Sequence, residues 1–126
     1  MNLHGTIPSS IFDKCRRLVE VRFNRNEFSG PIPTTIGHLK DVTIVDFSNN
    51  QLTGTLPHQI SLLIDVQQFS IANNNVRGSI PDLISSAANL RLLEVSRNVI
   101  TGTIPTLIGD LHHLQDLYLE TNYLSG

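Results

Sequence analysis

Residues 50–57 read Asn-Gln-Leu-Thr-Gly-Thr-Leu-Pro, and variants of this phrase recur along the whole chain. Six glycines mark the copies, and they lie 25, 24, 24, 24 and 24 residues apart: Gly5, Gly30, Gly54, Gly78, Gly102 and Gly126. A fixed period of this length is typical of a solenoid, in which each coil stacks on its neighbours because it cannot bury its apolar edge alone. The sequence therefore predicts a stack of similar coils.

Apolar residues fall into columns when the coils are aligned on these glycines. Before each glycine comes an apolar set, such as Val42, Val45, Phe47 and Leu52, and after it comes Ile-Pro or Leu-Pro, as at residues 56–57. The full unit is L-x-x-L-x-L-x-x-N-x-L-x-G-x-I-P-x-x-I-G-x-L-x-x. Residues 19–23, Val-Glu-Val-Arg-Phe, alternate in polarity as a half-buried strand does. One such strand per coil predicts a parallel sheet.

This repeat resembles the plant-specific class of leucine-rich repeat, as in the ectodomains of plant receptor-like kinases and in polygalacturonase-inhibiting proteins. The resemblance covers essentially the whole chain, and the L-x-G-x-I-P phrase is specific to that class. It implies an α/β-type solenoid, a right-handed superhelix with a parallel β-sheet on its concave face, short lateral strands, and 3-10 or irregular turns on its convex face. We expect residues 1–126 to form a single domain with no visible N- or C-terminal cap.

An asparagine stands four residues before each of the last five glycines: Asn26, Asn50, Asn74, Asn98 and Asn122. An amide side chain offers two donors and an acceptor, so stacked asparagines can satisfy backbone groups where the chain turns away from the strand. Leaving one such buried group unpaired costs roughly 1–3 kcal/mol. We expect these residues to form a structural ladder.

Composition excludes several classes of function. A net charge of −2 and a pI near 6.2, without a basic stripe, argue against nucleic-acid binding. No apolar run approaches the ~20 residues of a membrane helix, so we expect no membrane contact by this segment. The chain shows no signal peptide, no glycosylation acceptor and no disulfide pair. An extracellular or cell-surface location is therefore implied by the resemblance alone.

The side chains that carry chemistry do not converge. His4, His38, His58 and His112 occupy four different columns, and His113 lies on a loop. Neither a nucleophile elbow nor a phosphate-binding loop is present. We expect no catalytic site, no metal and no cofactor. The single cysteine, Cys15, is expected to be a small buried filler on the convex side.

The strand residues between the apolar columns remain as candidates for binding, because packing leaves them free to vary and alternation points them to the concave face. The mixture of charges with an aromatic residue suits recognition of a protein or peptide; an ordinary solvated sheet face is the alternative. The candidates are Glu20, Arg22, Asn24, Arg25, Asp46, Ser48, Gln68, Ser70, Glu94, Ser96, Asp116, Tyr118 and Glu120.

Three functions are consistent with this sequence. The first is a receptor-like ectodomain segment that recognises a protein or peptide in signalling or defence. The second is a soluble inhibitor of a cell-wall-degrading enzyme. The third, ice binding or a structural role, is suggested by Thr53-Gly54-Thr55 and Thr101-Gly102-Thr103, although Arg77 and Pro31 interrupt those columns. Uncapped terminal coils also predict end-to-end self-association.

Overall fold

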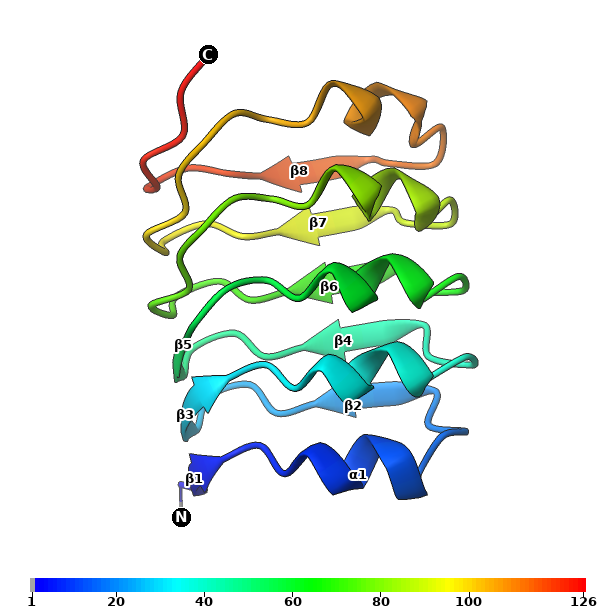
Figure 1. Ribbon diagram of the computed structural model, residues 1–126, viewed down its shortest axis with the longest axis vertical. Coiled ribbons are helices and arrows are strands. Elements are labelled where there is room, and N and C mark those ends of the chain that lie inside the picture. The colour runs from blue at the N-terminus through cyan, green and yellow to red at the C-terminus, as the bar shows by residue number, and fades with distance from the viewer. Residues whose placement is uncertain (1) are drawn as a thin grey trace.

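Each turn of the chain adds one short strand to the same face of a stack (Figure 1). The computed structural model describes residues 2–126. Within this range five strands form a parallel sheet in the order β2-β4-β6-β7-β8, namely β2 Glu20–Arg22, β4 Ile44–Asp46, β6 Gln68–Ser70, β7 Leu92–Glu94 and β8 Asp116–Tyr118. Val45 lies opposite Val21 on one side and Phe69 on the other. The predicted solenoid with a parallel sheet is confirmed.

A second, smaller sheet runs along the side of the stack. It contains β1 (His4–Thr6), β3 (Glu27–Pro31) and β5 (Gln51–Thr53), paired in parallel in that order. Isolated bridges between Thr55 and Arg77 and between Thr103 and Ser125 extend the same pairing further along the stack. These are the short lateral strands that the resemblance to plant leucine-rich repeats implies.

Short helices cover the side opposite the larger sheet (Figure 1). Four are single 3-10 turns, and each follows a proline whose fixed φ suits the position before a helix. They are η1 Thr34–His38, η2 His58–Leu62, η3 Asp82–Ser86 and η4 Thr106–Asp110.

The first coil differs because it is one residue longer. Its convex segment is an α-helix, α1 Ser9–Lys14, of six residues. An α-helix rises about 1.5 Å per residue and a 3-10 helix about 2.0 Å, so six residues of the first span nearly the same length as five of the second. The change of helix type thus accommodates the extra residue without breaking the stack.

The position of Cys15 differs from the one expected. Cys15 is exposed and caps the C-terminal end of α1, so the expectation of a buried filler was wrong. In the coils of η1 and η2 the residue just after the helix, Leu39 or Leu63, is fully buried. In the first coil Cys15 has that place after the helix, and the fully buried residue is instead Phe12, inside α1. The longer helix therefore turns a phenylalanine inward and leaves the cysteine in solvent.

The core lies between the larger sheet and the convex helices and runs through every coil. Phe47, Phe69 and Ile36 are fully buried within it. Burial falls at the last coil, where Leu117 is 37% exposed although Leu93 at the same position is 1% exposed. Each coil therefore depends on both neighbours for its burial, as expected for a solenoid.

The five asparagines link consecutive coils through their amide groups. Asn74 Nδ2 donates to the carbonyl oxygens of Phe47 (3.0 Å), Ile71 (3.0 Å) and Ala72 (3.3 Å). Asn74 Oδ1 accepts from the N–H of Leu52 at 2.9 Å. Asn98 repeats the same four bonds one coil further on, including 3.0 Å from Val76 N to its Oδ1. The ladder thus satisfies backbone groups of two coils at each step.

Replacing Asn74 by alanine is expected to lower the free energy of unfolding by about 1–3 kcal/mol, because the Leu52 N–H loses its acceptor in a buried setting and the Phe47 carbonyl keeps only the bond from Asn50 Nδ2. Denaturant titration followed by circular dichroism measures the loss. The control is Asn75→Ala, at an exposed neighbour, which should change stability by less than about 0.5 kcal/mol. Equal effects of the two substitutions would contradict this role of the ladder.

Candidate ligand-binding face

Strand register gathers the candidate residues into rows that run along the stack. One row contains Arg22, Asp46, Ser70, Glu94 and Tyr118, each opposite the next on the neighbouring strand. A second row places Glu20, Ile44, Gln68, Leu92 and Asp116 side by side in the same way. Hydrogen-bonded strands lie roughly 4.8 Å apart, so each row is a closely spaced line of different side chains.

At the β2 end of the face, the charges are largely satisfied by neighbours. Arg22 Nε lies 2.9 Å from Glu20 Oε2 within the same strand. Asp46 Oδ1 accepts from Ser48 Oγ at 2.6 Å and from Ser48 N at 3.0 Å. The Arg22–Glu20 pair is exposed, so it contributes little to stability and is available for exchange with a ligand.

At the β7–β8 end, the acidic groups have fewer partners. Ser70 Oγ donates to Glu94 Oε2 at 2.9 Å, which orients that carboxylate from the neighbouring strand. Within residues 2–126 no ion pair involves Glu94, Asp116 or Glu120. Tyr118 is 43% exposed opposite Glu94. This end therefore presents uncompensated negative charge around an accessible aromatic ring.

Three of the candidate serines lie on the expected face but are buried. Ser48, Ser70 and Ser96 are 9%, 6% and 4% exposed. Short side chains lie lower than the long ones around them, and two of these hydroxyls already bond to acidic neighbours. They form the floor of the face, whereas the other ten candidates are exposed or half-buried. The alternation of the sequence predicts which side chains lie on this face, but it does not predict how deeply each one is buried.

The turn that follows each strand uses left-handed backbone at a non-glycine residue. Arg25, Asn49, Asn73, Arg97 and Thr121 all have φ of 56–58°. Asparagine adopts this region readily, whereas it is a genuine outlier for a β-branched residue. Asn73 Nδ2 also donates to Asn49 Oδ1 at 3.1 Å. The repeated turn holds Arg25 and Arg97 at equivalent places on the edge of the concave face.

One contact was not anticipated from the sequence. His38 Nδ1 lies 2.6 Å from Asp13 Oδ1, and this joins η1 to α1. Its only signal is the 25-residue separation of the two residues, which equals the length of the first coil. Within residues 2–126, no three His, Cys, Asp or Glu side chains group as metal ligands, and no helix is long and apolar enough to cross a membrane.

The leucine-rich repeat family model matches residues 41–63 and 89–111. Among solved structures, the plant peptide hormone receptor RGFR1 in complex with RGF2 is 32% identical, with a TM-score of 0.95 over 98% of this chain and 20% of that one. The BIR3–SERK2 complex from Arabidopsis thaliana is 32% identical, with a TM-score of 0.81 over 84% of this chain and 57% of that one. No curated protein matches the chain by sequence.

The receptor kinase HAESA of Arabidopsis, solved with the peptide hormone IDA and the co-receptor SERK1, is also 32% identical, with a TM-score of 0.95 over 99% of this chain and 21% of that one. The chain thus spans from about a fifth to about three fifths of these relatives. Residues 41–63 and 89–111 match leucine-rich repeats, and the chain has the leucine-rich repeat fold seen in solved plant receptor kinase ectodomains.

Changing Thr121 to asparagine should stabilise the protein by about 0.5–1 kcal/mol, because asparagine fits the left-handed turn that the β-branched threonine occupies under strain. Thermal and denaturant unfolding measure the gain. Thr53→Asn, at an exposed threonine of strand β5, should bring no gain. A loss of stability in Thr121→Asn would contradict the proposed strain.

Proposed function

We propose that this chain is a recognition module that binds a protein or peptide on its concave face, as part of a plant receptor-like kinase ectodomain. The proposed role is in signalling or defence, outside the cell or at its surface. The supporting observation is that unlike side chains, most of them exposed or half-buried, form rows along a sheet of regular register. We propose no catalytic role and no cofactor for it.

The physical character of the face supports recognition over simple solvation. Its β7–β8 end combines Tyr118 with the unpaired carboxylates of Asp116 and Glu120. Aromatic anchors contribute most to binding energy at protein interfaces, and charges around them steer the partner. A strand-built face is also rigid, so little ordering of the protein opposes binding.

The similar structures support a receptor role over the two alternatives. RGFR1 and HAESA are described with peptide hormones bound, and HAESA with a co-receptor as well. RGFR1 is described as a receptor and HAESA as a receptor kinase, which gives the enzyme-inhibitor alternative less support. The ice-binding alternative remains a hypothesis that rests on threonine columns broken by Arg77 and Pro31.

A random 12-residue peptide library selected against the purified chain tests where peptides bind. Binding of the selected peptides, measured by fluorescence polarisation, should weaken about tenfold or more in the double variant Arg22→Glu with Tyr118→Ala. His112→Ala, an exposed change after η4, serves as the control and should leave affinity unchanged. Circular dichroism of each variant checks that the fold is retained.

The proposal would be contradicted if the selected peptides bound the double variant Arg22→Glu with Tyr118→Ala as tightly as they bind the unchanged chain. It would also be contradicted if no selected peptide lost affinity in the double variant while several lost affinity in His112→Ala, because those peptides would bind the convex side.

A further inference from the structure

A groove opens on the side of the stack that carries the short helices and the lateral strands. Its volume is about 550 Å³, and it lies between the two neighbouring coils that contain η1 and η2, near the first residues of these helices. None of its lining residues belongs to the strands of the concave sheet. Small-molecule sites in proteins typically enclose about 300–1,000 Å³, so one sugar-sized ligand fits this space.

Close approach of two turns forms one wall of the groove. Gly54 has a φ of +72°, and a Cβ on it would lie 3.1 Å from Pro31 Cβ. The glycine therefore lets the apolar ring of Pro31 pack against the next coil. The bridge between Thr55 and Arg77 then brings an arginine from the following coil to the same groove.

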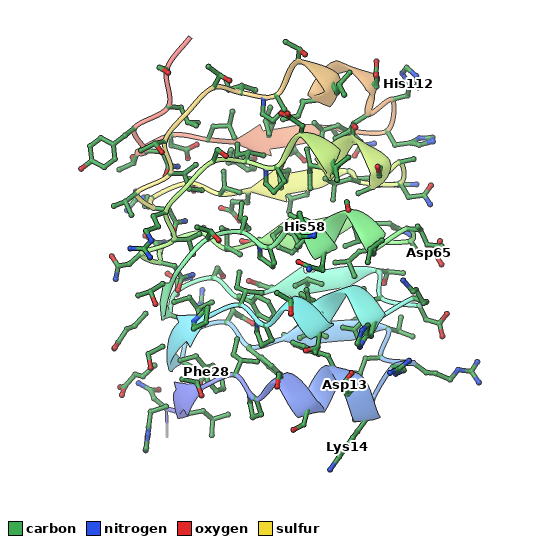
Figure 2. All side chains as sticks on the ribbon, viewed as in Figure 1. Asp13, Lys14, Phe28, His58, Asp65 and His112 are labelled. Carbon is green, nitrogen blue, oxygen red and sulfur yellow. The ribbon has the colours of Figure 1, made fainter. Side chains whose placement is uncertain are left out.

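Most polar residues of the groove are exposed, and they are suited to a ligand that carries negative charge. Arg77 lines the groove and has no ion-pair partner within residues 2–126. Figure 2 places His58 at the start of η2, midway along the stack, and its ring also lines the groove. A planar guanidinium binds a carboxylate through two parallel hydrogen bonds, so Arg77 is suited to an acidic group.

The repeat architecture does not account for these polar residues. One coil further on, 24 residues later, Arg77, His58 and Gln59 are replaced by Thr101, Asp82 and Leu83. One coil earlier the same positions hold Thr53, Thr34 and Thr35. At the equivalent positions, neither neighbouring coil therefore brings an arginine, a histidine and an amide together.

Gln59 supplies an independent observation at the same place. Its Oε1 is buried and has no hydrogen-bond partner within residues 2–126, although the residue lines the groove. A buried acceptor without a donor is costly, and such atoms in folded proteins call for an explanation. The terminal amide torsion is broad, so it can turn this oxygen toward a donor such as a ligand hydroxyl.

We propose that this groove binds an acidic sugar, a pyranose ring that bears a carboxylate. Arg77 pairs with the carboxylate, while Gln59, Thr55 and His58 bond to ring hydroxyls. The apolar C–H face of the ring packs on Pro31. A hydroxyl-rich anion uses both the cationic and the neutral polar groups of the groove, whereas a simple anion uses only Arg77 and His58.

Amide chemical shifts of the ¹⁵N-labelled chain, recorded during titration with glucuronate, glucose or N-acetylglutamate, test this site. A ligand of this size is expected to bind with a Kd of about 1 mM. Glucuronate should move the amides of Thr34, Thr55, His58 and Arg77. Glucose lacks the carboxylate and N-acetylglutamate lacks the ring, so each should bind at least about fivefold more weakly.

Arg77→Gln should weaken glucuronate binding by at least about fivefold, and Arg97→Gln, at another exposed arginine, on the concave turn, should not change it. Thermal unfolding verifies that both variants are folded. The proposal is overturned by an absence of shifts at these amides up to about 20 mM glucuronate, some twenty times the expected Kd. It is also overturned if N-acetylglutamate binds as tightly as glucuronate, or if the two arginine variants behave alike.

Discussion

The fold depends on the hydrogen bonds of a buried amide repeated once per coil. Each ladder asparagine accepts from a backbone N–H of the coil before it. From Asn50 onward each also donates to carbonyls of both coils, as Asn98 does with Ile71 and Val95. These backbone groups bond to the ladder amides and not to the backbone of a neighbouring strand, and they would otherwise be buried without partners. The amide column therefore removes the free-energy cost of unpaired backbone groups that stacking at this spacing would otherwise carry.

The concave face follows from that constraint. Because the ladder fixes where each strand ends, every coil presents its variable residues in the same register, and residues such as Arg22, Asp46 and Glu94 form one row. Core packing restricts which residue types can occupy the buried positions beneath this row, whereas the residue types in the row itself can differ from coil to coil. The stable part of the repeat and the part available for recognition are thus separate sets of residues on the same short strands.

The features that recur in every repeat could be predicted from the sequence: the coils, the parallel sheet, the lateral strands and the convex turns. It did not predict features that depend on departures from the period or on depth. Cys15 is exposed because one extra residue converts a 3-10 turn into α1 and turns Phe12 inward. Ser70 and Ser96 are buried because longer neighbours surround them, which alternation alone cannot reveal.

Native-state hydrogen exchange tests the central role of the ladder most directly. The amides of Leu52, in β5, and of Val76, outside the strands, donate to the side chains of Asn74 and Asn98. We predict that they exchange as slowly as the sheet amides of Phe47 and Ile71, which donate to neighbouring strands. Exchange of Leu52 and Val76 at the fast rate of an exposed turn would contradict the account, because the ladder would then not hold the coils together.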